Sequence, residues 1–211
     1  MPNLAPSAPK RRRLKSAERK KELIEAAIRL FSEGGFQGTT TRRLASAAGI
    51  SEALLYRHFA TKEQLYDAII DDQMRDTPRS LPPALRAAAE RNDDQAVMKM
   101  MGELILRTYR RQPAYIRLLV YSALEGHGLS LRFFERQVRG HYEFLIAYFR
   151  KRIAAGAFRK AHPAAAARAW MGMVNHHGLV RTLFRDSILS LSDARALDVF
   201  AALFLGGIRK P

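Results

Sequence analysis

Cysteine is absent from the 211 residues, which excludes disulfide bonds and thiolate metal sites and is typical of a protein from a reducing compartment. The sequence also lacks a long hydrophobic run. Its longest apolar stretch near the end, residues 199–208, is far shorter than the roughly 20 residues that span a bilayer. The N-terminus, MPNLAPSAPKRRR, has no apolar segment of the kind found in secretory signals. We therefore expect a cytoplasmic protein that does not contact a membrane.

Sequence signatures of enzymes are missing as well. We find no nucleophile motif, no phosphate-binding loop and no carboxylate–histidine metal pattern. The adjacent His176 and His177 would point about 100° apart on a helix, so they are poorly placed to share one ion. We expect a protein that is not an enzyme, with no cofactor and no bound metal.

Positive charge is what the sequence has in excess. It contains 36 Lys and Arg against 20 Asp and Glu, a formal net charge of +16, and such a charge attracts polyanions. Residues 1–21 hold eight basic residues and one acidic residue, whereas residues 22–66 hold five of each. We expect residues 1–15 to form a disordered basic arm. Its basic cluster either contacts DNA or only keeps the protein in solution: Lys10, Arg11, Arg12 and Arg13.

Helical periodicity runs through the remaining chain, and no stretch shows the alternating pattern of a strand. Ile24, Ala27, Ile28 and Phe31 recur at three- and four-residue steps, which places them on one face of a helix that begins near Ser16. Two short helices and a fourth one that opens at a Thr61–Gln64 capping box follow it. After a proline-rich break at residues 76–83, we expect helices over residues 93–110, 113–125, 130–155, 163–184 and 193–206.

Residues 40–59 have the pattern of a helix-turn-helix. Small residues at Ala45, Ala47 and Ala48 let two helices approach closely, and Gly49 permits the sharp turn between them. A helix–glycine–helix corner also occurs in many helical proteins that do not bind DNA, so this pattern alone is a weak indication.

The longer segment GTTTRRLASAAGISEALLYRHFATKEQLY, residues 38–66, resembles the DNA-binding domain of the TetR/AcrR family of regulators. The positions that match the family pattern, without a gap, are Thr39, Thr40, Arg42, Leu44, Ala45, Ala48, Gly49, Ile50, Ser51, Leu55, Tyr56, His58, Phe59, Thr61, Lys62 and Leu65. The resemblance implies an all-α fold with an N-terminal three-helix helix-turn-helix domain at residues 16–66. It implies a larger helical effector-binding and dimerisation domain at residues 67–211.

The function implied is that of a ligand-responsive homodimeric repressor that binds a palindromic operator in double-stranded DNA. A non-specific nucleic-acid-binding protein, an activator and a helical-bundle enzyme are the alternatives. The sequence identifies neither the operator nor the effector.

The resemblance also implies which side chains contact DNA. Those with phosphate-directed roles are Thr40, Thr41, Tyr56, His58 and Lys62, while Arg42 reaches either a guanine edge or a phosphate. Those that open the second helix of the motif and face the bases are Ser51, Glu52, Ala53 and Leu54. For Tyr56 and His58 packing against the first helix is the alternative, and for Thr40 it is a purely capping role.

The family also implies a ligand cavity among the later helices, for an effector that would be hydrophobic or aromatic. The candidate lining residues are Met101, Leu104, Tyr121, Phe134, Tyr142, Trp170 and Met173. Apolar stripes of this kind more often form core than pocket.

Dimerisation is expected on separate grounds, because two half-sites of a palindrome need two recognition helices about one DNA turn apart. The last two helices carry small residues that would allow close packing against a second copy: Gly172, Gly178, Ala201, Ala202 and Gly206. An ordinary intramolecular core is the alternative.

Overall fold

The computed structural model describes residues 16–75, 81–126, 128–184 and 191–210, and every structural statement below refers to them. They are almost entirely helical, apart from an isolated β-bridge between Phe158 and Arg209, so the expected all-α fold is confirmed. In chain order the elements are α1 (Ser16–Gly34), α2 (Thr41–Ala47), α3 (Glu52–His58), α4 (Lys62–Arg75), α5 (Pro83–Glu90), α6 (Asp94–Arg111), α7 (Pro113–Leu124), α8 (Gly128–Phe133), the π-helical turn η1 (Phe134–Val138), α9 (Arg139–Ala154), α10 (Pro163–Phe184) and α11 (Asp193–Ile208).

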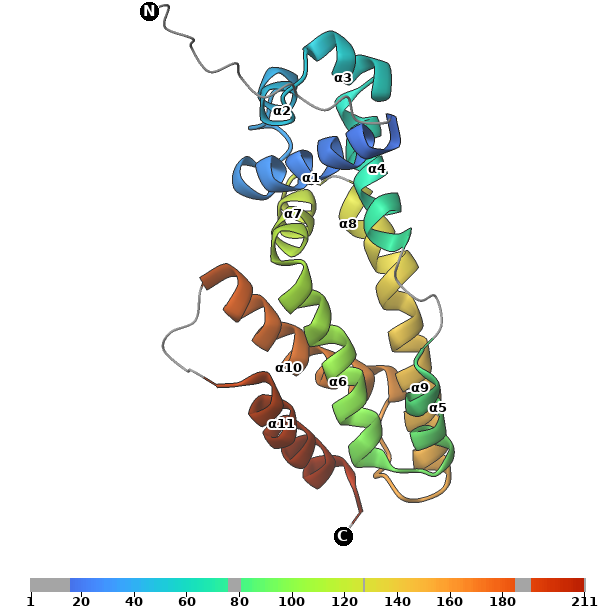
Figure 1. Ribbon diagram of the computed structural model, residues 1–211. Helices are drawn as coiled ribbons and strands as arrows, with labels where there is room; N and C mark the ends of the chain where they lie inside the picture. The colour runs from blue at the N-terminus through green and yellow to red at the C-terminus, as the bar shows by residue number, and fades with distance from the viewer. Residues whose placement is uncertain (1–15, 76–80, 127, 185–190, 211) are drawn as a thin grey trace, which may run out of the picture.

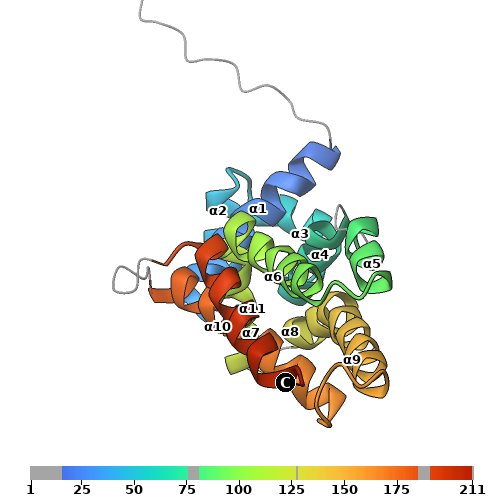
Figure 2. The same ribbon diagram turned by 90° about the horizontal axis from the view of Figure 1, so that it is seen from below.

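The molecule is elongated, with α1, α2 and α3 at one end and α5, the start of α6 and the end of α9 toward the other (Figure 1). Helices α7 and α8 lie next to α1 and α4, and α10 and α11 pack on α6. Seen from below, α10 and α11 lie side by side at the surface (Figure 2). None of the described helices is both long enough and apolar enough to cross a membrane.

Two features of the helical pattern differ from the expectation. Helix α5, which begins at Pro83, was not among the predicted helices. Proline is well tolerated in the first turn of a helix, where no intrahelical donor is needed, and the alanine-rich segment that follows favours a helix. The single helix expected over residues 130–155 is divided by the π-helical turn η1. Periodicity does not reveal such a turn, because the chain is helical on both sides of it.

The buried residues form two clusters, which we call the upper core and the lower core. The upper core joins α1–α4 with α7 and α8 and includes Leu23, Ile24, Phe31, Phe36, Leu44, Leu55, Phe59, Leu65, Tyr66, Ile69, Ile70, Tyr115, Ile116, Leu118, Leu119 and Leu129. The lower core joins α5, α6, α9, α10 and α11 and includes Leu85, Val97, Met98, Met101, Leu106, Leu145, Phe149, Phe158, Trp170, Met171, Val174, Leu197 and Leu205. The upper core therefore continues past residue 66, the end of the expected DNA-binding domain, into α4 and α7.

The turn after α1 is attached to the C-terminal end of α7, a contact that we call the α1–α7 junction. The Glu125 carboxylate accepts hydrogen bonds from the backbone N–H groups of Phe36 (3.0 Å) and Gln37 (3.3 Å). The Tyr121 hydroxyl donates to the carbonyl oxygen of Glu33 at 3.4 Å. Because the neighbouring side chains of both helices are buried in the upper core, this junction positions α1 relative to the rest of the chain.

A second attachment joins α4 to the segment formed by α8 and η1. Arg132 pairs with Asp67, and Arg136 pairs with Asp71 at 2.9 Å. All four side chains are well exposed, so each pair contributes at most about 1 kcal/mol. The position of α4 therefore depends more on its buried side chains in the upper core than on these pairs.

Helix α10 crosses α6 at a point where only a glycine fits. A Cβ atom on Gly178 would lie 2.6–2.8 Å from three ring atoms of Tyr109, closer than side chains approach one another. The Tyr109 ring is held in place because its hydroxyl donates to Asn175 Oδ1 at 3.1 Å. The intramolecular alternative for Gly178 is therefore the correct one, since its close contact lies within one protomer.

We expect Gly178→Ala to destabilise the protein by about 1–3 kcal/mol, because the added methyl group overlaps the Tyr109 ring. Gly140→Ala is the matched control: Gly140 lies in α9, where a Cβ would enter open space, and alanine favours a helix by up to about 1 kcal/mol. Urea unfolding followed by circular dichroism measures both variants. Equal free energies of unfolding for the two would contradict the packing described here.

Candidate DNA-binding surface

Helix α2 begins at a side-chain cap that the sequence makes available. Thr40 adopts an extended backbone conformation, and its Oγ1 accepts a hydrogen bond from the backbone N–H of Arg43 at 3.2 Å. Leu44 and Ala45 are buried in the upper core, whereas Arg42 and Arg43 are exposed on the opposite side. The cap and the burial together orient the start of α2, with its free N–H groups, toward solvent.

The turn after α2 depends on Gly49. This residue has a φ of 65°, a left-handed conformation that glycine adopts without a steric penalty. The backbone N–H of Ile50 then donates to the carbonyl oxygen of Ala45 at 3.0 Å, which closes α2 with the pattern of a Schellman motif. The turn predicted from the sequence is present at the predicted residue.

Helix α3 is anchored along one side and exposed along the other. Ser51 caps it by accepting from the backbone N–H of Leu54 at 3.2 Å, and Leu55 and Phe59 are buried in the upper core. The exposed side presents Ala53 and Arg57, which are four residues apart and therefore share a face. A short helix held in this way has the form that a recognition helix needs in order to enter the major groove.

None of the ten residues predicted to contact DNA is buried. Those that are exposed are Thr40, Arg42, Ser51, Glu52, Ala53 and Tyr56. Those that are partly buried are Thr41, Leu54, His58 and Lys62. Their roles in DNA binding remain predictions. The basic cluster of the arm, residues 10–13, lies outside the described residues.

Thr41, Glu52 and Tyr56 are linked across the two helices, which the sequence pattern does not reveal. The Thr41 hydroxyl donates to Glu52 Oε1 at 2.8 Å, and the Tyr56 hydroxyl lies 3.5 Å from Thr41 Oγ1. The contact holds the carboxylate of Glu52 toward α2. Sequence reasoning identified all three residues as separate DNA contacts, but not that they contact one another.

Lys62 is directed toward protein carbonyl groups. Its ammonium group donates to the carbonyl oxygens of Phe36 (2.7 Å) and Thr39 (3.0 Å) and lies 4.0 Å from the centre of the Phe36 ring. An ammonium group has three protons, so these bonds leave one for a further acceptor. Lys62 thus connects the start of α4 to the turn between α1 and α2.

Two exposed arginines beside the motif were not among the predicted contacts. Arg43 lies on α2, where its guanidinium Nη1 is 3.4 Å from the carbonyl oxygen of Gly38, and Arg57 lies in the last turn of α3. With Arg42 they give this surface three guanidinium groups against the single carboxylate of Glu52. Arg57 could have been predicted from the sequence, because it lies four residues after Ala53 and so shares its helix face.

The seven residues predicted to line an effector cavity lie in different parts of the described structure. Met101 and Trp170 are fully buried in the lower core, and Leu104 and Met173 pack against it. Phe134 and Tyr142 form a separate ring contact, with centroids 6.0 Å apart. Tyr121 lies at the α1–α7 junction.

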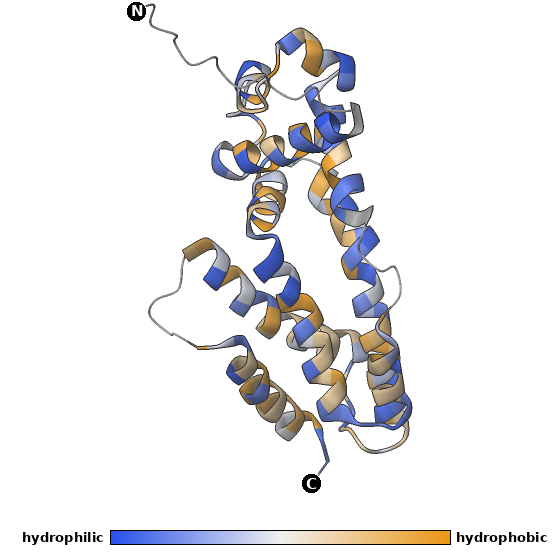
Figure 3. Ribbon diagram, in the orientation of Figure 1, coloured by the Kyte–Doolittle hydropathy of each residue, from blue (hydrophilic) through white to orange (hydrophobic). Residues whose placement is uncertain are grey.

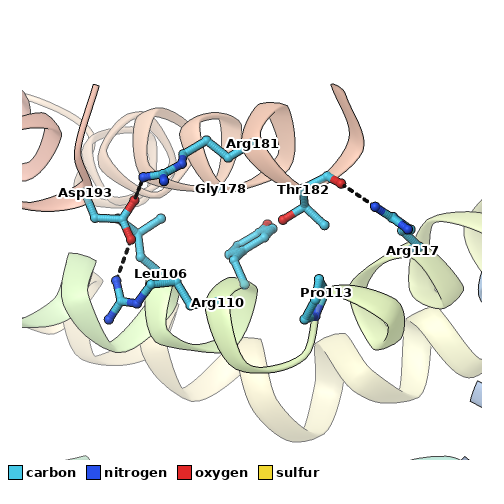
Figure 4. Close-up of a pocket in the computed structure, with 9 residues that line it drawn as sticks. Leu106, Arg110, Pro113, Arg117, Gly178, Arg181, Thr182 and Asp193 are labelled. Atoms are coloured by element: carbon cyan, nitrogen blue, oxygen red, sulfur yellow. Dashed lines mark hydrogen bonds and ion pairs between the residues drawn. The ribbon is translucent and has the colours of Figure 1, made fainter. Parts of the chain in front are cut away.

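A pocket of about 250 Å³ lies elsewhere, between α6, α7 and α10, and none of those seven residues lines it (Figure 4). The predicted residues are mostly core because large apolar side chains at helical spacing serve first to fill the space between helices.

Comparisons with known proteins agree with the motif. Residues 23–69 match the family model described as bacterial regulatory proteins, tetR family. The chain is 32% identical over 108 residues to the nucleoid occlusion factor SlmA of Glaesserella parasuis serovar 5 (strain SH0165), a match that covers 51% of this chain and 52% of SlmA. The chain thus spans about half the length of the curated relatives that it matches first.

Solved structures share the fold over a greater length. A TetR transcriptional regulator from Agrobacterium tumefaciens superimposes with a TM-score of 0.67 at 22% identity, covering 92% of this chain and 95% of that one. AibR in complex with isovaleryl coenzyme A and operator DNA superimposes with a TM-score of 0.60 at 23% identity, covering 88% and 97%. At these identities the likeness shows the fold.

We expect Lys62→Met to lower the free energy of unfolding by about 1–3 kcal/mol, because two carbonyl oxygens lose a charged donor. Lys21→Met is the control, since Lys21 is exposed on α1, and its stability should stay within about 0.5 kcal/mol of the original protein. Urea titration measures both. If Lys62→Met unfolds at the same urea concentration as Lys21→Met, the internal role given to Lys62 is wrong.

Proposed function

Given that the chain belongs to the TetR family of bacterial regulatory proteins, we propose that it is a ligand-responsive homodimeric repressor that binds a palindromic operator. The observation that carries the proposal is the exposed helix α3, held on the upper core by Leu55 and Phe59 with its other side open to solvent. A capped, rigid and exposed second helix after a tight glycine turn is what reading base edges in the major groove requires.

The contacts in this proposal follow from the exposed side chains. Arg42 binds a guanine edge or a phosphate. The cap residue Ser51 and the first residues of α3 (Glu52, Ala53 and Leu54) face the bases. The Thr40 hydroxyl, the His58 imidazole and the guanidinium groups of Arg43 and Arg57 bind phosphates. The hydroxyl protons of Thr41 and Tyr56 are directed to Glu52 and Thr41, so these two residues bind phosphates when DNA replaces those hydrogen bonds. The arm, Lys10–Arg13, adds salt-dependent affinity along the backbone or in the minor groove.

Two residues that were predicted to contact DNA, Glu52 and Lys62, act mainly within the protein in this proposal. Glu52 accepts a hydrogen bond from the Thr41 hydroxyl, so its carboxylate acts mainly in orienting Thr41 and Tyr56 rather than in reading a cytosine. Lys62 acts mainly by fixing the turn before α2, and only its third proton is left for a phosphate.

The dimer in this proposal is formed by α10 and α11. Gly172 on α10 and Ala202, Leu203 and Gly206 on α11 are exposed within one protomer, and Leu203 leaves 67% of its surface open. Figure 3 shows that α11 is largely apolar although it lies at the surface. An apolar face with small residues allows two helix pairs to pack closely across a two-fold axis.

The effector in this proposal binds among the helices beyond α4 and opposes DNA binding. AibR, which shares the fold, was solved with both isovaleryl coenzyme A and operator DNA. Effector and operator must weaken each other's binding by the same factor, through a coupling of typically about 1–3 kcal/mol.

We expect Arg42→Ala to weaken operator binding roughly 10- to 100-fold, because it removes one bidentate or phosphate contact worth about 1–3 kcal/mol. Arg86→Ala, at an exposed position of α5 far from the motif, should leave the affinity unchanged. The operator is first selected from a random duplex pool, and affinities are then measured by fluorescence anisotropy at fixed salt.

Two results of this experiment would count against the proposal. If random duplex competes as well as any selected sequence, the protein is a non-specific nucleic-acid-binding protein. If Arg86→Ala weakens binding as much as Arg42→Ala does, the α2–α3 surface is not the binding surface.

We expect Leu203→Glu to convert the dimer into monomers, because two new carboxylates would face each other near the two-fold axis. Leu131→Glu on α8 is the matched control, since Leu131 leaves 61% of its surface open but lies away from α10 and α11. Sedimentation velocity measures the masses. A dimer that survives Leu203→Glu would place the interface elsewhere.

A further inference from the structure

The pocket between α6, α7 and α10 combines apolar walls with an excess of positive charge. Its apolar part is formed by Leu106, the ring of Tyr109, Pro113 and the bare backbone at Gly178. Its volume of about 250 Å³ is below the roughly 300–1,000 Å³ of pockets for drug-sized ligands, so it suits a smaller molecule.

Three guanidinium groups line the pocket, those of Arg110, Arg117 and Arg181, against one carboxylate, that of Asp193 (Figure 4). The Asp193 carboxylate is fully engaged: Arg110 and Arg181 each approach it to 2.5 Å, and His177 Nε2 lies 3.0 Å away. Burial alone would raise the pKa of Asp193, but the donors and charges around it hold that pKa below its usual range. Asp193 is therefore ionised, and its charge is already shared among other groups.

Arg117 is the cation in this pocket without an anionic partner among the described residues. Its guanidinium donates to the backbone carbonyl oxygen of Thr182 at 3.1 Å, and no described carboxylate lies within ion-pair distance of it. Arg110 has a second carboxylate partner in Glu103, outside the pocket. Arg117 is half-buried, where an unpaired positive charge favours binding an anion more strongly than it would in open water.

We propose that this pocket binds a small monocarboxylate with an apolar body, whose carboxylate pairs with Arg117 and whose body lies against Tyr109 and Pro113. A guanidinium group matches a carboxylate bidentately. A doubly charged phosphate monoester fits less well, because the carboxylate of Asp193 lies in the same pocket and repels the second charge. That this ligand is the effector rests on the function proposed above.

Helix α7 connects this pocket to the DNA-binding surface. Pro113 and Arg117 lie in its first half and line the pocket, whereas Tyr121 and Glu125 at its other end form the α1–α7 junction. A carboxylate that draws the Arg117 guanidinium away from the Thr182 carbonyl changes how α7 lies against α10. Because α7 is one uninterrupted helix, the change reaches the turn before α2.

The test compares benzoate, phenylacetate and isovalerate with their neutral amides, at equal concentrations and constant ionic strength. We expect at least one of these carboxylates to raise the thermal unfolding temperature and to give a saturable isothermal titration, while its amide gives neither. Arg117→Gln should abolish or weaken this binding at least 10-fold, and Arg117→Lys should restore part of it.

Arg107→Gln is the matched control, because Arg107 is an exposed residue of α6 that does not line the pocket. It should bind the carboxylate as the original protein does. The proposal is overturned if none of the three carboxylates binds better than its amide, or if Arg117→Gln and Arg107→Gln bind them equally well. Circular dichroism of each variant verifies that it is folded.

A separate readout distinguishes this site from the proposed function. Carboxylate binding is measured without DNA, and operator binding of Arg117→Gln is measured without carboxylate. If the carboxylate binds but does not change operator affinity, the pocket stands and its role as the effector site is wrong. If the original protein binds no duplex, the proposed function is wrong. The carboxylate titration without DNA still shows whether the pocket binds a carboxylate.

Discussion

The position of the helix-turn-helix depends on the junction between α1 and α7. Glu125 binds two backbone N–H groups of the turn that follows α1, and the side chains beneath that turn are part of a core shared with α7. A carboxylate that accepts two backbone hydrogen bonds holds a turn in one conformation more firmly than water would. The Lys62 ammonium group holds the same turn by donating hydrogen bonds to the carbonyl oxygens of Phe36 and Thr39. The turn before α2 is therefore fixed from both sides, and α2 and α3 are further held by their own buried side chains in the upper core.

The local parts of this arrangement could be predicted, because they depend on residues close together in the chain. Thr40 and Ser51 cap the two helices and Gly49 makes the turn, each within four residues of the groups that it binds or redirects. The start of α5 at Pro83 follows the same local rules, but the prolines around it were interpreted as a break between helices. Periodicity alone also joined α8, η1 and α9 into a single helix.

The parts that escaped prediction depend on contacts between distant residues. Glu125 is 89 positions from Phe36, and nothing in its own neighbourhood indicates a partner. The cationic pocket is hidden for a related reason, since its three arginines are a small part of the 36 basic residues and only the crossing of α6, α7 and α10 brings them together. Met101 and Trp170 were predicted to line a cavity because they are large and apolar. Both are fully buried, and side chains of this kind fill the space between packed helices.

The DNA-binding helices are attached to the rest of the chain at the α1–α7 junction and through α4. Both attachments are supported by the buried upper core, to which α4 contributes Leu65, Ile69 and Ile70, and the pairs of Arg132 and Arg136 with α4 add exposed contacts that water screens. A shift of α7 therefore acts on α1 through the side chains that they bury together and through the hydrogen bonds of Glu125. In the two-fold dimer proposed above, a rotation of α1–α4 in each protomer changes the distance between the two α3 helices. A ligand that displaces Arg117 would in this way put both helices out of register with their half-sites.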